Sequence, residues 1–281
     1  MGKVTVVGSG VMGKGIAYAF AISGYEVHVQ DISFENLRKA KEDIDALLDS
    51  SLEKGYLESN AYESAKKNLV FEPDLKKAAE GAELVVEAVI ERMDVKIDVF
   101  KQLDEICPPD TVLATNTSTM SPTEIGAQTS RPDKVIAMHF FNPVHKMKLI
   151  EVIRGLETSD TTVNFVHETA ARINKSTVEV NEFPGFVTSR MNCLIGNEAM
   201  YLLMEGVASA KDIDKAMKLG LNHPMGPLEL ADLVGLDTRL RNMEYLHATL
   251  GEKYRPCPLL VKYVKAGRLG RKSGRGFYEY N

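Results

Sequence analysis

Short apolar runs rich in Val and Ile alternate with longer stretches of helical periodicity up to about residue 181. Strands of a parallel sheet produce such runs, because helices cover both faces of the sheet. The pattern therefore predicts an α/β fold with a doubly wound sheet. Its first six predicted strands are residues 4–7, 26–30, 69–71, 84–88, 112–115 and 135–138.

A seventh predicted strand, residues 149–153, follows too soon after His139 for a crossover helix to fit between them. We therefore expect this last pair of strands to be antiparallel. Among the helices, apolar positions between Leu37 and Leu52 mark one face of a long helix that Gly55 would end. Residues 121–124, Ser-Pro-Thr-Glu, form a capping box with Pro at the first helical position.

The pattern changes after Phe183-Pro184-Gly185-Phe186, where strand-like alternation stops. We therefore predict two domains: a Rossmann-type α/β domain at residues 1–184 and an all-α domain at residues 185–281. At about 150 residues per domain, the length of 281 residues also favours two domains. The predicted helices of the second domain lie near residues 190–206, 211–219, 227–234, 238–250 and 258–266.

Composition and charge narrow the function classes. With 34 Lys and Arg against 39 Asp and Glu, the net charge is −5, and the absence of a basic run argues against nucleic-acid binding. No apolar run reaches the roughly 18 residues of a membrane span. Cys107, Cys193 and Cys257 are scattered, so neither a disulfide framework nor a Cys-x-x-Cys site is indicated. We expect a protein of a reducing, cytoplasmic compartment.

The first predicted strand leads directly into Gly8-Ser9-Gly10-Val11-Met12-Gly13, and a helix follows as far as Gly24. In such a turn the first Gly makes the bend, the second lets a pyrophosphate approach the backbone, and the third allows close helix packing. Asp31 closes the second strand, where its carboxylate can accept hydrogen bonds from the adenine-ribose hydroxyls. A glycine-rich turn with a solvated Asp is the alternative, but the combined spacing favours a dinucleotide site.

The same Asp31 indicates which dinucleotide binds. Its carboxylate repels a ribose 2′-phosphate, and residues 32–34 contain no Arg that could accommodate one. We therefore predict NAD as the cofactor in preference to NADP.

Polar residues at the carboxyl ends of the strands are candidates for the reacting site, because ligands of open α/β sheets bind there. Residues 116–118, Asn-Thr-Ser, follow one strand, and His139 follows another. Glu151 lies inside an apolar strand; either it is buried and needs a partner, for which His139 is the nearest candidate, or the strand is an exposed edge. A His with an orienting carboxylate beside a nicotinamide site can transfer the proton of an alcohol oxidation, while NAD takes the hydride.

Metal-assisted chemistry is not indicated. The His residues, at positions 28, 139, 145, 167, 223 and 247, form no ligand pairs at close helical spacing. We predict that the protein uses no metal ion.

With these residues identified, the whole chain resembles the 3-hydroxyacyl-CoA dehydrogenase family, and most of all its bacterial 3-hydroxybutyryl-CoA dehydrogenases. A single matching motif would indicate little, but the combination of motifs is specific to this family. The matching segments are residues 8–13, 86–88, 116–118, 139–143, 148–153, 184–186, 223–227 and 270–274.

The resemblance implies that NAD interconverts an (S)-3-hydroxyacyl-CoA with the 3-oxoacyl-CoA. His139 would be the general acid or base, Glu151 would orient its ring, and Ser118 would bind the substrate oxygen. Lys54 would contact coenzyme A. The residues that would contact the cofactor, besides residues 8–13, are Asp31, Glu91, Lys96, Asn116, Ser118, Asn142 and Lys272. Without the resemblance, Lys54, Glu91, Lys96 and Lys272 would be interpreted as solvated surface.

One position departs from the family pattern. Family members usually have Asn in the stretch after Pro184-Gly185-Phe186 where this chain has Ser189, which keeps a hydroxyl but loses the amide. We expect Ser189 to lie near the reacting end of the acyl chain, where it would affect substrate positioning and catalysis.

Two other functions are compatible with the sequence. One is a hydroxy-acid dehydrogenase that does not use coenzyme A, such as a gulonate dehydrogenase. The other is a non-catalytic NAD-binding protein, against which the presence of both His139 and Glu151 argues. The helical domain has several apolar faces, so we expect one of them to contact another subunit. The family resemblance implies a homodimer or a higher homo-oligomer assembled through this domain.

Overall fold

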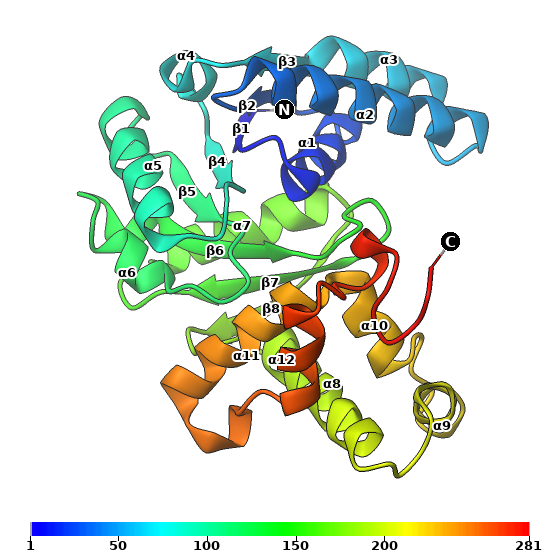
Figure 1. Cartoon of the computed structure of the whole chain (residues 1–281). Coiled ribbons are helices and arrows are strands. Elements are labelled where there is room, and N and C mark those ends of the chain that lie inside the picture. Colours follow the sequence, from blue (N-terminus) through cyan, green and yellow to red (C-terminus); the bar gives the residue numbers. More distant parts are fainter. Residues whose placement is uncertain (1, 281) are drawn as a thin grey trace. The chain divides into compact units, whose positions relative to one another are not determined.

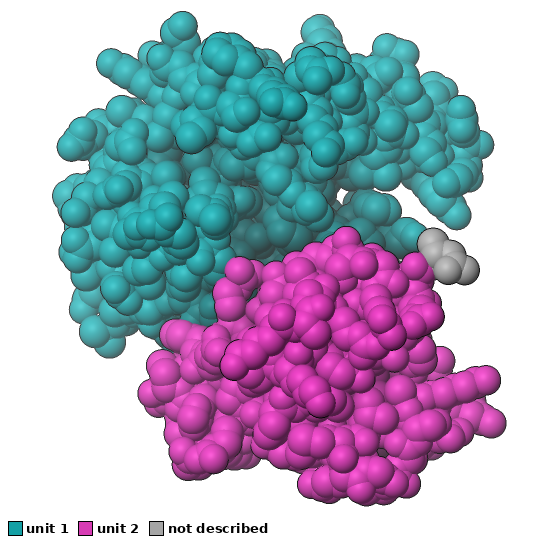
Figure 2. All heavy atoms as spheres, viewed as in Figure 1, with its two compact units in different colours: residues 1–182 teal, residues 183–281 magenta. Residues whose placement is uncertain are grey.

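The computed structural model describes residues 2–280 of the chain, which divide after residue 182 into two compact units, here called unit 1 (residues 2–182) and unit 2 (residues 183–280) (Figure 2). The division lies two residues before the predicted boundary. Unit 1 contains an eight-stranded sheet in the order β3-β2-β1-β4-β5-β6-β7-β8 (Figure 1). Its strands are β1 (Lys3–Val7), β2 (Glu26–Gln30), β3 (Leu69–Glu72), β4 (Leu84–Glu87), β5 (Val112–Thr115), β6 (Val135–Phe140), β7 (Leu149–Arg154) and β8 (Ser176–Asn181).

Helices cover both faces of this sheet, and alternate residues of a strand pack against different helices. In β4, Leu84 and Val86 belong to one apolar core, whereas Val85 belongs to a second core with Phe100 and Leu103 of α5. This arrangement explains the continuous apolar runs. The helices of unit 1 are α1 (Val11–Ile22), α2 (Phe34–Glu53), α3 (Ser59–Asn68), α4 (Leu75–Ala79), α5 (Met93–Ile106), α6 (Pro122–Gly126) and α7 (Asp160–Arg172).

Two helix ends that the sequence predicted are confirmed, the start of α6 and the end of α2. The Ser121 hydroxyl accepts a hydrogen bond from the Glu124 N–H at 2.9 Å and caps α6. Gly55 lies just beyond α2 with a φ of +71°, a left-handed conformation that favours glycine.

The far edge of the sheet differs from the prediction. β6 and β7 are antiparallel, as predicted, but β7 is not the last strand, because α7 connects it to a parallel β8. The sequence of β8, Ser-Thr-Val-Glu-Val-Asn, is largely polar and none of its residues is buried. It therefore lacks the apolar run by which the other strands are recognised.

Unit 2 is helical, as predicted. Its apolar core includes Met200, Leu228, Leu236, Met243 and Leu246. The helices of unit 2 are α8 (Thr188–Met204), α9 (Ala210–Gly220), α10 (Pro227–Val234), α11 (Leu236–Leu250) and α12 (Pro258–Lys265). Within residues 2–280, no helix is both long enough and apolar enough to cross a bilayer.

Candidate active site

The glycine-rich turn between β1 and α1 has the backbone that a dinucleotide requires. A Cβ atom on Gly13 would lie 1.8 Å from the carbonyl oxygen of Gly8, and one on Gly8 would lie 2.7 Å from that of Ala88. Both glycines are therefore needed for close packing. A Cβ on Gly10, in contrast, would meet no atom within 4 Å, which leaves space for a pyrophosphate at the start of α1. These residues fit NAD.

Asp31 follows β2 and faces this turn. Its carboxylate accepts hydrogen bonds from the Ser9 N–H at 3.0 Å, from the Ser9 hydroxyl at 2.8 Å and from the Ser33 N–H at 3.0 Å. Burial alone would raise the pKa of Asp31, but these hydrogen bonds outweigh it and lower the pKa. The carboxylate is therefore ionised at neutral pH, as an acceptor for ribose hydroxyls must be.

His139 and Glu151 are direct partners across the antiparallel pair β6 and β7. The distance from His139 Nδ1 to the nearer carboxylate oxygen of Glu151 is 2.7 Å. Glu151 is fully buried, so it does not lie on an exposed sheet edge, the alternative left open by the sequence. The ring of His139 also packs against Phe141, with ring centroids 4.6 Å apart. The imidazole is thereby held in one orientation with a carboxylate at Nδ1.

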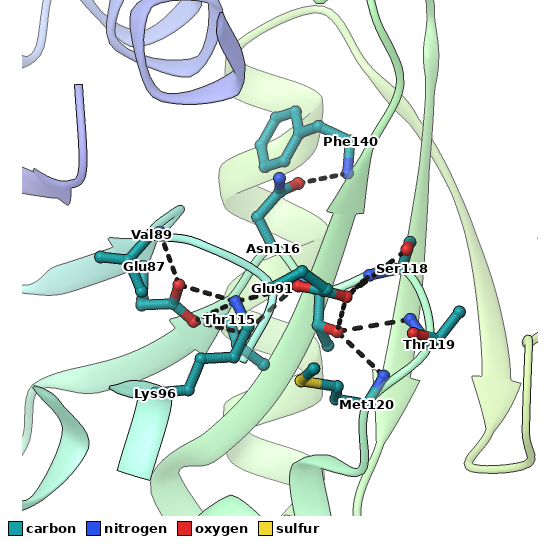
Figure 3. Close-up of polar contacts among 11 residues, drawn as sticks. Glu87, Val89, Glu91, Lys96, Thr115, Asn116, Ser118, Thr119, Met120 and Phe140 are labelled. Carbon is teal, nitrogen blue, oxygen red and sulfur yellow. Dashed lines mark hydrogen bonds and ion pairs between the residues drawn. The ribbon is translucent and has the colours of Figure 1, made fainter. Parts of the chain in front are cut away.

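Asn116 connects the end of β5 to the end of β6. Its side-chain oxygen accepts a hydrogen bond from the Phe140 N–H at 2.9 Å, beside His139 (Figure 3). The amide therefore helps to fix the backbone that carries the histidine.

Ser118 lies in the loop after β5 and contacts Glu91 from the loop after β4 (Figure 3). Glu91 accepts hydrogen bonds from the Thr117 hydroxyl at 2.5 Å and from the Ser118 N–H at 3.0 Å, and the Ser118 hydroxyl lies 3.5 Å away. Burial alone would raise the pKa of Glu91, but the charge of Lys96 and these hydrogen bonds lower it. The loop that carries Ser118 is therefore anchored on an ionised carboxylate.

Lys96 is buried, with 1% of its side chain exposed. The alternative interpretation of Lys96 as a solvated surface residue is therefore wrong. Its ammonium lies 2.8 and 3.0 Å from the two carboxylate oxygens of Glu87 and 3.2 Å from an oxygen of Glu91. Burial would lower the pKa of Lys96, but the two carboxylates outweigh it and raise the pKa. Because an ammonium has three N–H donors, any contact of Lys96 with a cofactor must share one of them.

Glu87 is a site residue that sequence reasoning missed. It ends β4, is fully buried, and also accepts hydrogen bonds from the Thr115 hydroxyl and the Val89 N–H, both at 2.7 Å. The sequence did indicate a buried carboxylate at this position, because Glu87 is an acidic residue in an apolar strand, as Glu151 is. Lys96 had a signal too, since it lies on the buried face of α5 with Phe100 and Leu103.

The other expected site residues belong to other elements of the chain. Lys54, at the end of α2, and Asn142, in the loop after β6, are exposed. Lys272 and Ser189 belong to unit 2, where the Lys272 ammonium lies 2.5 Å from Asp237 and Ser189 is half-buried in the first turn of α8. Among residues 2–280, no three His, Cys, Asp or Glu side chains form a group that could hold a metal ion.

Comparison with known proteins decides the family. Residues 3–183 match the sequence model of the 3-hydroxyacyl-CoA dehydrogenase NAD-binding domain, and residues 185–280 match that of the family's C-terminal domain. The chain belongs to the 3-hydroxyacyl-CoA dehydrogenase family. It is accordingly an NAD-dependent oxidoreductase, as the sequence predicted.

Relatives in this family resemble the chain over nearly its whole length. The chain is 50% identical to a probable 3-hydroxybutyryl-CoA dehydrogenase of Bacillus subtilis (strain 168), over 99% of this chain and 97% of that protein. It is 47% identical to the 3-hydroxybutyryl-CoA dehydrogenase of Clostridioides difficile, over 99% of both. The crystal structure of (S)-3-hydroxybutyryl-CoA dehydrogenase from Ralstonia eutropha is similar with a TM-score of 0.95, at 43% identity over 99% of both chains.

Proposed function

We propose that this enzyme interconverts (S)-3-hydroxybutyryl-CoA and acetoacetyl-CoA with NAD. The observation that carries the proposal is the pairing of His139 with the buried Glu151 at the end of an NAD-binding sheet. The names of the relatives at 47% and 50% identity support a short-chain acyl-CoA as the substrate.

In the oxidative direction, His139 removes the proton of the substrate hydroxyl. Bound NAD supplies the acceptor for the hydride. Glu151 holds Nδ1, so the proton is transferred at Nε2, and the carboxylate stabilises the imidazolium that forms. The Ser118 hydroxyl is 3.5 Å from Glu91, a long contact that it can exchange for the substrate oxygen.

The proposal also assigns the contacts of the ligands. Lys54 binds coenzyme A, and Ser189 lies near the acyl chain. The cofactor is bound by Gly8, Ser9, Gly10, Val11, Met12 and Gly13 of the turn and by Asp31, Glu91, Lys96, Asn116, Ser118, Asn142 and Lys272.

Reduction of acetoacetyl-CoA by NADH, followed by the loss of NADH absorbance, tests the function directly. We expect saturable turnover that is lost when acetoacetate replaces acetoacetyl-CoA. Equal saturation without the coenzyme A moiety would indicate a hydroxy-acid dehydrogenase instead. NADH binding without turnover of either compound would indicate a non-catalytic NAD-binding protein.

We propose further that the enzyme is a homodimer assembled through unit 2. This unit exposes large apolar side chains, among them Met191 of α8 and Leu219 of α9. A pocket of about 330 Å³ between α8, α9 and α10 is lined by Leu194, Leu202 and Met217, among others. Two-fold pairing is the commonest way to cover such a surface. Sedimentation at micromolar concentration is expected to give a dimer, and a monomer would refute the assembly.

A cytoplasmic location completes the proposal. Cys107, Cys193 and Cys257 are all unpaired and buried, which fits a reducing compartment. Cell fractionation checks this, and recovery in a secreted fraction would contradict it.

A further inference from the structure

Glu87, Glu91 and Lys96 form a cluster, here called the Glu87 cluster, between the ends of β4 and β5 (Figure 3). Both oxygens of Glu87 face only hydrogen-bond donors, namely Lys96, Thr115 and Val89, so both oxygens act as acceptors, as those of a carboxylate anion do. Lys96 donates hydrogen bonds to both oxygens of Glu87 and forms an ion pair with Glu91 at 3.2 Å. Two carboxylates and one ammonium give the cluster a net charge of −1.

The immediate surroundings do not cancel this charge. Arg92 and Asp94, at the start of α5, are ion-paired with each other and add no net charge. The remaining donors to the cluster are the Thr115 and Thr117 hydroxyls and the backbone N–H groups of Val89 and Ser118, all of which are uncharged. Two of the three charged side chains are buried, so water screens the cluster only in part.

The cluster lies on the nicotinamide side of the predicted cofactor path. Cofactors of this fold bind where the strand order reverses, which here is between the neighbouring β1 and β4. Since Asp31 at the end of β2 suits the adenine ribose, the nicotinamide half extends toward β4 and β5. The cluster also adjoins the glycine-rich turn, because a Cβ on Gly8 would lie 2.9 Å from the Val89 nitrogen that donates to Glu87.

We propose that the Glu87 cluster acts as a fixed negative charge that favours binding of NAD⁺ over NADH. The nicotinamide ring carries a positive charge in NAD⁺ and none in NADH, so a net negative site stabilises only the oxidised form. Glu87 is a positioning residue in this device: it holds Lys96, which in turn holds Glu91 against Thr117 and Ser118. The inference requires NAD binding but does not depend on which alcohol the enzyme oxidises.

Three proteins, two of which share the same cluster charge, test the proposal by cofactor binding alone. Wild type has a cluster charge of −1, Glu87→Gln has 0, and Glu87→Gln combined with Lys96→Met returns to −1. NADH fluorescence gives the Kd of NADH, and competition with NADH gives that of NAD⁺. We expect the ratio of Kd for NAD⁺ to Kd for NADH to rise about three- to tenfold in Glu87→Gln, the effect of one partly screened unit charge.

The double variant separates charge from structure. Its ratio is expected to return to within about twofold of wild type, because the net charge is restored. Both affinities are expected to be weaker than in wild type, since Glu91 then loses its ion pair with Lys96. If Glu87→Gln does not fold, Glu91→Gln gives the same charge of 0 at a side chain that is 39% exposed.

The matched control is Thr111→Val, which removes a buried hydrogen bond to the Ala82 carbonyl at the opposite end of β5. It is expected to lower stability and leave the ratio of the two Kd values unchanged. Equal weakening of NAD⁺ and NADH in Glu87→Gln would overturn the proposal, as would a double variant whose ratio stays raised. A wild type that binds NADH but does not reduce acetoacetyl-CoA would refute the proposed function. The ratio of the two Kd values could still be measured in that case, so the proposal on the Glu87 cluster would remain testable.

Discussion

Two carboxylates are fully buried in apolar strands of the sheet, and they differ in where their partners come from. Glu151 of β7 contacts His139, its direct neighbour on the antiparallel strand β6. Glu87 of β4 contacts Lys96, which lies nine residues further along the chain on α5. The first partner is another strand-end residue with obvious chemistry, and the second is one Lys among many polar positions of an amphipathic helix.

A buried carboxylate therefore predicts that a partner exists but does not identify the chemistry of that partner. Glu151 orients a titratable ring, so we assign it to proton transfer. Glu87 holds a permanent cation, so we assign it to positioning and to charge. Variants of either pair test these assignments, and variants of Asp31 and Ser189 provide comparisons outside the two pairs. They follow from the largest expected effect to the smallest.

Removing His139 breaks the proposed catalytic pair. His139→Ala is expected to lower the turnover of acetoacetyl-CoA by about 10²- to 10⁴-fold, the usual contribution of a positioned general acid or base. The Kd of NADH should change little, which a fluorescence titration measures. Turnover equal to wild type would refute the assignment of His139.

Neutralising Glu151 tests the same pair from the other side. Glu151→Gln keeps the shape of the side chain but removes the charge that stabilises the imidazolium, so turnover should fall in the same direction as for His139→Ala. Steady-state kinetics with saturating NADH measure the decrease. An unchanged kcat would show that Glu151 has no part in proton transfer.

Breaking the second pair should affect stability first. Lys96→Met leaves Glu87 buried without its counter-ion, for which we expect a loss of about 3–5 kcal/mol in the free energy of unfolding. Urea unfolding measures it. The matched control is Lys54→Met, an exposed Lys at the end of α2, which should change the free energy of unfolding by less than about 0.5 kcal/mol. Equal effects of the two substitutions would contradict the buried ion pair.

Asp31 provides a carboxylate outside the apolar strands for comparison. Asp31→Ala should weaken NADH binding and reduce discrimination against NADPH, because the role proposed for the carboxylate is to accept hydrogen bonds from ribose hydroxyls and to repel a 2′-phosphate. Titrations with both cofactors measure the preference. A wild type that prefers NADPH would contradict the role of Asp31.

The smallest expected effect concerns Ser189 in unit 2. Ser189→Asn restores the amide usual in the family, and we expect it to raise kcat for acetoacetyl-CoA with little change in NADH affinity. If Asn192, one helical turn later, already supplies the amide, Ser189→Asn should slow the enzyme and Asn192→Ala should be the damaging change. A neutral Ser189→Asn would show that the position does not govern catalysis.

Much of the fold and of the cofactor site could be predicted because the signals are local. The glycine-rich turn needs only six consecutive residues between a strand and a helix, and Asp31 directly follows the next strand. The pairing of His139 with Glu151 depends on one short connection between neighbouring strands.

The sequence by itself determined the two-part organisation, the NAD site and the catalytic candidates, because apolar periodicity and turn residues act over short distances. Only the tertiary structure decided the place of β8, whose polar strand is held by pairing with β7, and which carboxylates neutralise the buried Lys96. A Lys inside a helix is ordinarily solvated, since burying its charge is costly. It becomes stable in the interior only where folding brings Glu87 and Glu91 to its ammonium, from a strand end and a loop whose meeting no local pattern specifies.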